Sequence, residues 1–115
     1  MNVLFIVLNK VEYLDEILDS FVEIGIRGAT ILDSQGMGSA LNSHGRGSEP
    51  FFGMLRHMLD ESRPYNKTIF TVVEDDELLE KAVESVMAIV GDIHKPGVGM
   101  MFTLPVGNVY GMINR

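Results

Sequence analysis

The chain has 115 residues, of which 46% are hydrophobic and 22% charged, and its formal net charge is −7 at pH 7. This length fits one domain, and the apolar content suits a packed core rather than a disordered chain. The acidic balance disfavours binding to DNA or RNA phosphates. The absence of cysteine excludes disulfides, a thiol nucleophile and cysteine-ligated zinc. We therefore expect a single domain over residues 1–115, located in the cytoplasm and without a nucleic-acid partner.

The first third of the chain predicts a strand, a helix and a second strand. Residues 3–8 are a continuous apolar run, typical of a strand covered on both faces and too short to span a membrane or form a signal peptide. Asn9 is placed to cap a helix that Gly25 ends. Residues 26–34 follow as a strand. The helix prediction depends on apolar residues spaced by three and four, namely Val11, Leu14, Ile17, Leu18, Phe21 and Ile24.

Residues 35–67 are rich in glycine and predict a long loop, with a short helix over 51–59. Loops longer than about 12–15 residues in a compact domain are usually functional or disordered. Four large apolar residues are unusual in such a loop. We expect them either to pack on the oligomer as a mini-helix or to contact a protein partner: Phe51, Phe52, Met54 and Leu55.

The rest of the chain repeats the first pattern. Residues 68–73 are β-branched and aromatic and predict a strand, and the acidic residues 74–76 suit the start of a helix that Gly91 ends. A glycine-bearing loop over 94–99 leads to a last strand over 100–106. The order predicts the ferredoxin-like split βαβ fold of the α+β class (β-α-β-β-α-β), an antiparallel sheet with both helices on one face.

Helices on one face leave the other face of the sheet without a cover from its own chain. The first strand is apolar at every position from 3 to 8, so this uncovered face is apolar as well. A contiguous exposed apolar patch is typical of an association surface. We therefore predict a homo-oligomer that packs sheet to sheet.

Three segments resemble those of the PII signalling proteins. Residues 28–38 (GATILDSQGMG) follow the pattern G-x-T-x-x-x-x-x-G-x-G, which in that family leads into a long mobile loop, the T-loop. Residues 66–75 resemble the family's third strand, and residues 97–106 (GVGMMFTLPV) resemble its G-D-G-K-I-F-V-x-P-V segment. With the long loop at the place of the T-loop, the chain is similar to the PII-like superfamily over nearly its whole length.

The resemblance implies a regulatory homotrimer without enzymatic activity. Small effectors, commonly adenine nucleotides, would bind in clefts between subunits, and the long loop would report their binding to a target protein. Glycines in such clefts let the backbone approach a ligand and offer N–H groups to an anion, although a tight turn explains the second group of glycines equally well. By the same resemblance the ligand-binding positions are Gly28, Thr30, Gly36, Met37, Gly38, Gly97, Val98 and Gly99, and Lys95 borders them.

A metal-responsive trimer like the CutA proteins is the alternative function, because they share this fold and assembly. His57 and Asp60 have the i, i+3 spacing of two ligands on one helical face, and His44 or Glu49 would have to complete the site. We interpret these residues as solvated and expect no metal. A ferredoxin-like enzyme such as an acylphosphatase is a third alternative, but that family's phosphate loop with its Arg and Asn is not seen, and no Ser-His-Asp arrangement is supported.

ATP is expected to bind weakly or not at all. The lysine of the family's G-D-G-K segment is Met100 here, and the two following family arginines fall at Gly111 and Ile113. Each charge-assisted hydrogen bond contributes about 1.5–3 kcal/mol, so three losses lower the affinity on the order of 10³-fold or more. Isothermal titration calorimetry measures this directly. A sub-micromolar Kd would contradict the prediction and would mean that another cation, such as Lys95, replaces those that are missing.

Overall fold

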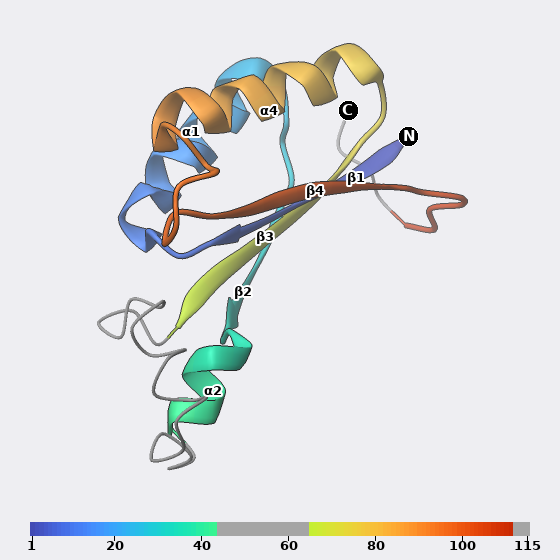
Figure 1. Cartoon of the computed structure of the whole chain (residues 1–115). Helices are drawn as coiled ribbons and strands as arrows, with labels where there is room; N and C mark the ends of the chain where they lie inside the picture. The colour runs from blue at the N-terminus through green and yellow to red at the C-terminus, as the bar shows by residue number, and fades with distance from the viewer. Residues whose placement is uncertain (44–64, 112–115) are drawn as a thin grey trace.

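The computed structural model describes residues 1–43 and 65–111. In these ranges four strands form one antiparallel sheet in the order β2-β3-β1-β4. Two helices, α1 and α4, lie side by side over one face of it (Figure 1). The predicted ferredoxin-like α+β fold is therefore confirmed. The elements are β1 (Asn2–Leu8), a 3-10 turn η1 (Val11–Tyr13), α1 (Leu14–Ile24), β2 (Thr30–Ser34), α2 (Met37–Ser43), β3 (Asn66–Val73), α4 (Asp76–Val90) and β4 (Gly99–Pro105).

The two long helices end where the sequence predicts. Helix α1 stops at Gly25, whose φ of 105° is left-handed, and the N–H of Ile26 donates to the carbonyl of Phe21 at 2.8 Å. Helix α4 begins at Asp75, whose carboxylate accepts the N–H of Leu78 at 2.7 Å, and its C-terminal cap is Gly91. Glycine thus ends both helices, and the Asp75 side chain caps the start of α4.

The first helix does not use Asn9 as its cap, so that prediction was wrong. Lys10 and Tyr13 occupy the cap positions of η1 and α1, and neither makes a side-chain capping bond. The Asn9 carboxamide instead accepts a hydrogen bond from Asn66 Nδ2 at 3.2 Å. A tertiary partner in the neighbouring strand therefore takes the oxygen that a cap would have used.

Residues 35–67 are not one continuous loop, which corrects the predicted boundary. Helix α2 begins directly after Gly36, and β3 already begins at Asn66. In helix α2 (MGSALNS), Met37, Ala40 and Leu41 have helical spacing, but seven residues among glycine and serine are too few for this pattern to predict a helix. The polar start of β3 is held by pairing with β2, in which Asn66 lies opposite Ser34 and Lys67 forms an ion pair with Asp33.

The other strand boundaries differ by a few residues. Strand β2 begins at Thr30 rather than residue 26, because Ile26 is bonded to the end of α1 and is buried there. Strand β4 covers Gly99–Pro105 rather than residues 100–106. The predicted helix over 51–59 lies outside the described residues.

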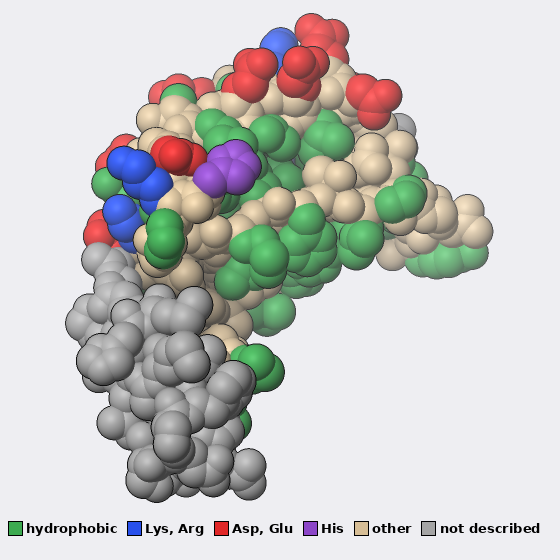
Figure 2. Space-filling view, in the orientation of Figure 1, with side chains coloured by type: hydrophobic (Ala, Val, Ile, Leu, Met, Phe, Trp, Pro, Cys, Tyr) green, Lys and Arg blue, Asp and Glu red, His purple; other side chains and the backbone are tan. Residues whose placement is uncertain are grey.

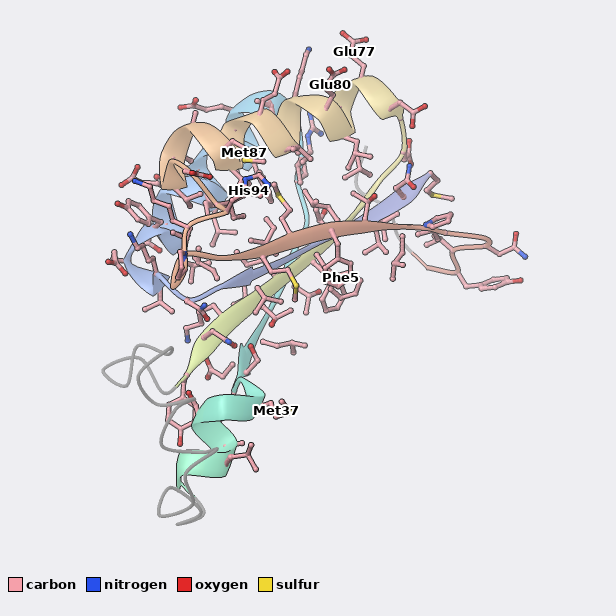
Figure 3. All side chains as sticks on the ribbon, viewed as in Figure 1. Phe5, Met37, Glu77, Glu80, Met87 and His94 are labelled. Carbon is pink, nitrogen blue, oxygen red and sulfur yellow. The ribbon has the colours of Figure 1, made fainter. Side chains whose placement is uncertain are left out.

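The core lies between the helices and the sheet. Alternate residues of β1 and β3 point into it, and both helices supply their apolar stripes. Acidic side chains gather on the outer surface of α4, and Glu77 and Glu80 point away from the sheet (Figures 2 and 3). The fully buried members include Leu4, Ile6, Leu8, Ile17, Phe21, Ile69, Val73 and Val86.

The opposite face of the sheet, here called the open face, is largely apolar, and neither α1 nor α4 lies on it (Figure 1). Phe5 lies on this side (Figure 3) and stacks on Phe70 of β3 at 5.4 Å and on Phe102 of β4 at 5.1 Å between ring centroids. Along the β4 edge, Met100 is 55% and Leu104 48% exposed. Strand β1 is thus apolar on both sides, as its sequence predicts.

The described residues contain no helix that is both long and apolar enough to cross a bilayer.

Replacing Gly99 by alanine is expected to destabilise the fold. A Cβ at Gly99 would lie 2.4 Å from the carbonyl oxygen of Val7, and the φ of 151° already disfavours a side chain. Overpacking of this kind costs about 1–3 kcal/mol in the free energy of unfolding. Urea denaturation measures it, with Gly107→Ala as the control because a Cβ there meets nothing within 4 Å. Equal stabilities of the two variants would contradict the prediction.

Candidate functional site

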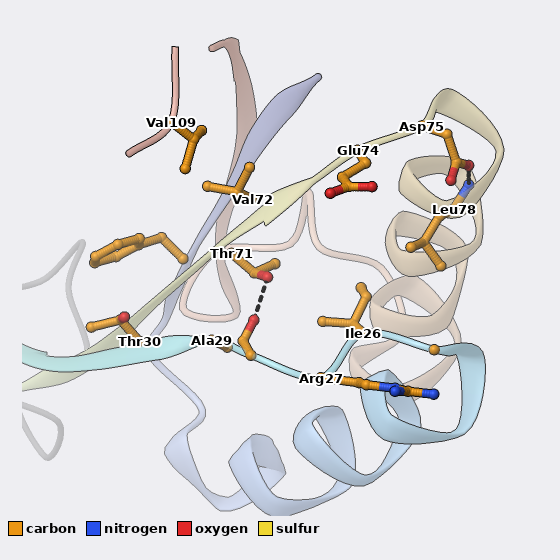
Figure 4. A pocket seen from close by; sticks show the side chains of 13 residues that line it. Ile26, Arg27, Ala29, Thr30, Thr71, Val72, Glu74, Asp75, Leu78 and Val109 are labelled. Atoms are coloured by element: carbon orange, nitrogen blue, oxygen red, sulfur yellow. Dashed lines mark hydrogen bonds between the residues drawn. The ribbon is translucent and has the colours of Figure 1, made fainter. Parts of the chain in front are cut away.

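A cavity of about 550 Å³ opens where the chain passes from α1 into β2, beside the start of α4 (Figure 4). Two of the predicted ligand-binding residues, Gly28 and Thr30, line it. Its other walls come from the C-terminal half of β3, the segment before α4 and the chain after β4. The lining residues are Gly25, Ile26, Arg27, Gly28, Ala29, Thr30, Phe70, Thr71, Val72, Glu74, Asp75, Leu78 and Val109.

Hydrogen bonds hold the cavity wall formed by residues 25–30. Thr71 Oγ1 donates to the carbonyl oxygen of Gly28 at 2.6 Å (Figure 4), and Thr71 is only 4% exposed. At the other end of this segment, Ile26 is bonded to Phe21 of α1. The segment before β2 is therefore fixed against both β3 and α1, and the cavity does not depend on an unsupported loop.

The cavity presents both apolar and polar groups. Phe70, Val72 and Val109 supply apolar surface on one side, with Val72 and Val109 close together in Figure 4. Arg27, Glu74 and Asp75 supply charge on the other side, one positive group and two negative ones. Ligand pockets of small molecules are typically 300–1,000 Å³, so this cavity has the volume of such a pocket, although polar groups make up much of its wall.

The glycine loop before β4 is a tight turn. The N–H of Val98 donates to the carbonyl of Lys95 at 3.4 Å across Pro96 and Gly97, and Gly97 has a φ of 84°. Proline followed by a residue of positive φ is typical of a type II turn. The turn explains Gly97, and the close approach to Val7 explains Gly99, without a ligand.

Val98 itself serves the fold. Its side chain is 3% exposed and belongs to the core, and its carbonyl accepts the N–H groups of Asn9 at 3.1 Å and Lys10 at 3.4 Å. A ligand at this loop would therefore meet the backbone of the flanking glycines and the exposed Lys95 rather than the Val98 side chain.

The remaining predicted residues lie near the start of α2 or beyond the described part. A Cβ at Gly36 would meet nothing within 4 Å, and Met37 is 75% exposed, so the start of α2 is an open surface. Gly38 lies in the first turn of α2. The proposed partner contacts Phe51, Phe52, Met54 and Leu55 lie outside the described residues. So do His44, Glu49, His57 and Asp60, and residues 1–43 and 65–111 contain no cluster of three metal-ligating side chains.

A single copy of the chain keeps the cavity and the glycine loop apart. Thr30 lies on the β2 edge of the sheet, whereas Gly99 begins β4 at the opposite edge. Three strand spacings separate the two edges, which is about 14 Å. Along the strands, Thr30 is level with Phe102, three residues further from the glycine loop. Gly36 lies at the same end of the sheet as the glycine loop, but beyond the opposite edge strand.

Sequence reasoning missed much of the cavity wall. Phe70 and Val72 were expected only as members of a strand, and Val109 lies in a tail that gave weak signals. The two-residue period of side chains along a strand could have placed Phe70 and Val72 on one face. Their position beside Thr30 follows from the register of β2 against β3, which periodicity does not give.

The fold and its glycine-bearing segments define the PII-like class of small α+β proteins. Residues 1–113 match the family model described as Nitrogen regulatory protein P-II, so the chain belongs to this family, and the predicted resemblance is confirmed. Among solved structures, the chain is similar to Arabidopsis thaliana PII bound to citrate, with a TM-score of 0.61 and 18% identity. The match covers 91% of this chain and 76% of that chain, and it shows a shared fold.

Replacing Thr71 by valine is expected to loosen the cavity wall. The substitution keeps the shape but removes the bond to the Gly28 carbonyl. We expect a loss of about 0.5–1.5 kcal/mol in the free energy of unfolding, as for one neutral hydrogen bond. Thr103→Val at an exposed position of β4 is the matched control and should change stability little. Urea denaturation of both variants checks this, and an equal effect would show that the bond contributes nothing.

Proposed function

We propose that this P-II family protein is a regulatory homotrimer that binds a small anionic or adenylyl effector between subunits and signals through its long loop. The observation that carries the proposal is the separation of the cavity from the glycine loop, on a sheet whose open face is apolar. A ligand that contacts both regions needs a second copy of the chain, and the open face supplies the reason for that copy to associate.

The open face supports the assembly energetically. Its exposed apolar residues include Leu32, Met100, Phe102 and Leu104, which lie on three different strands together with the Phe5 stack. Burying a large apolar side chain contributes about 1.5–3 kcal/mol each, so several together favour association. Figure 2 shows hydrophobic side chains along the sheet and acidic ones over α4, and the acidic helix surface is the less suitable one for self-association.

The cavity supports a small, partly apolar effector. Phe70 and Val72 offer apolar contact to a planar ring, and Thr30 offers a hydroxyl beside the backbone of Gly28. In the neighbouring copy, the glycine loop and Lys95 would supply N–H groups and one positive charge for an anionic part. One lysine does not match three phosphates, so an effector with less charge than ATP fits these residues best.

The start of α2 supports a signalling role for the segment that follows it. Gly36 and Met37 directly follow β2, and Met37 is largely exposed. A ligand that binds one conformation of this segment better than another shifts the population toward it. The target protein would then recognise the long loop, including Phe51 and Phe52.

Ligand binding can be tested with a thermal-shift panel of adenine nucleotides, cyclic nucleotides, bicarbonate, 2-oxoglutarate and divalent metals. A specific ligand at one hundred times its Kd stabilises the native state by about 2.7 kcal/mol, which raises Tm. We expect a shift from an adenylyl compound or small anion, reduced in Thr30→Val. Stabilisation by divalent metals alone would contradict the proposal and favour a CutA-like protein.

The homotrimer can be tested by sedimentation equilibrium. We expect three times the chain mass of 12.7 kDa at micromolar concentration. Phe102→Glu should produce monomers, because burying an unpaired carboxylate at the contact costs several kcal/mol. Val22→Glu is the control, since Val22 is 69% exposed on α1 and away from the open face. A wild-type protein that sediments as a monomer would disprove the assembly.

A further inference from the structure

A row of polar residues crosses the sheet at the end where the chain enters α2. Ser34 Oγ hydrogen bonds with Asn66 Oδ1 and lies 2.7 Å from Thr68 Oγ1. Asn66 Nδ2 donates to Asn9 Oδ1 at 3.2 Å, and the N–H of Asn9 donates to the carbonyl of Val98 at 3.1 Å. These contacts form a continuous path from the β2 edge to the loop before β4.

The register of the sheet places these residues in one line. Ser34 is paired with Asn66, and Leu8 is paired with both Lys67 and Gly99. Asn9 follows Leu8 and therefore lies between Asn66 and Val98. The line ends two residues before Gly36 on one side and between Gly97 and Gly99 on the other, which are two of the predicted ligand-binding segments.

Asn66 is the central member of the row and is buried, with 8% of its surface exposed. Its carboxamide accepts from Ser34 and donates to Asn9, so both polar atoms have partners. Leaving a buried donor or acceptor without its partner costs about 1–3 kcal/mol. A displacement of Asn9 therefore disfavours the native position of Asn66, and a displacement of Asn66 disfavours that of Ser34.

We propose that the row Ser34–Asn66–Asn9–Val98 couples the glycine loop to the start of α2, with Asn66 as the positioning residue. Movement of the glycine loop on effector binding changes the hydrogen bonds of Asn9, and through Asn66 it changes the end of β2. This deepens the proposed function, because it takes both segments as parts of the effector site. Coupling of this kind acts equally in both directions, so a change at Ser34 also alters the glycine loop.

The reverse direction can be measured in the free protein by NMR-detected amide hydrogen exchange. The reporters are the N–H groups of Asn9 and Lys10, which both donate to Val98. Ser34→Ala should speed their exchange about fivefold, which corresponds to the loss of one neutral hydrogen bond. Ser34→Thr retains the hydroxyl and should restore wild-type exchange.

Thr71→Val is the matched control, because it removes one hydroxyl bond between β3 and the chain before β2 but lies outside the row. Thr71→Val should leave the amide exchange rates of Asn9 and Lys10 within about twofold of those in the wild type. A general loss of stability would instead raise these rates in both variants alike. If Ser34→Ala and Thr71→Val gave the same exchange rates at the Asn9 and Lys10 amides, the coupling would be overturned. If Ser34→Ala fails to fold, Ser34→Cys replaces it, since a thiol keeps nearly the same shape but is a weak hydrogen-bond donor to Asn66.

The exchange experiment on the coupling and the thermal-shift experiment on effector binding can fail independently of each other. A thermal-shift panel without any stabilising ligand would refute effector binding and would leave the coupling measured in the free protein standing. Unchanged exchange in Ser34→Ala would refute the coupling even if an adenine nucleotide such as ADP raised Tm.

Discussion

The apolar character of β1 on both of its faces is the constraint on which the rest of the structure depends. Leu4, Ile6 and Leu8 are buried beneath the helices, whereas Phe5 lies on the open face between Phe70 and Phe102. The two helices cover only one side of the sheet, so within residues 1–43 and 65–111 the Phe5 side has no helical cover. In the proposed homotrimer, association through the open face would remove this apolar surface from water, and the proposed inter-subunit site requires that step.

The edges of the sheet then determine where an effector can bind. Strand β2 carries the cavity at its start and α2 at its end, and β4 begins at the glycine loop on the other edge. Because β3 and β1 lie between these edges, the described part of one copy keeps the cavity and the glycine loop apart. In the proposed trimer, association of the copies would account both for the apolar open face and for the separation of the cavity from the glycine loop.

Most of the fold is predictable from the sequence because helix stripes, glycine stops and the apolar first strand are local signals. The site is less predictable because it depends on register and on tertiary partners. Asn9 has the sequence features of a cap but bonds to Asn66, fifty-seven positions away. Phe70 reads as an ordinary strand residue, and only its pairing opposite Thr30 places it at the cavity. Helix α2 is only seven residues long, so its few apolar residues gave too weak a signal to predict it.

The glycine loop shows how the fold limits the chemistry of the proposed site. A side chain at Gly99 would clash with the backbone of Val7, and the Val98 side chain is buried in the core. A charged side chain at either position would therefore disrupt the packing. With Met100 in place of the family lysine, the loop offers an effector its backbone and Lys95. In the proposed function, such a loop would bind an effector with little charge and would respond by moving. Such movement would change the hydrogen bond from Asn9 to Val98, and the row through Asn66 would transmit that change to the start of α2.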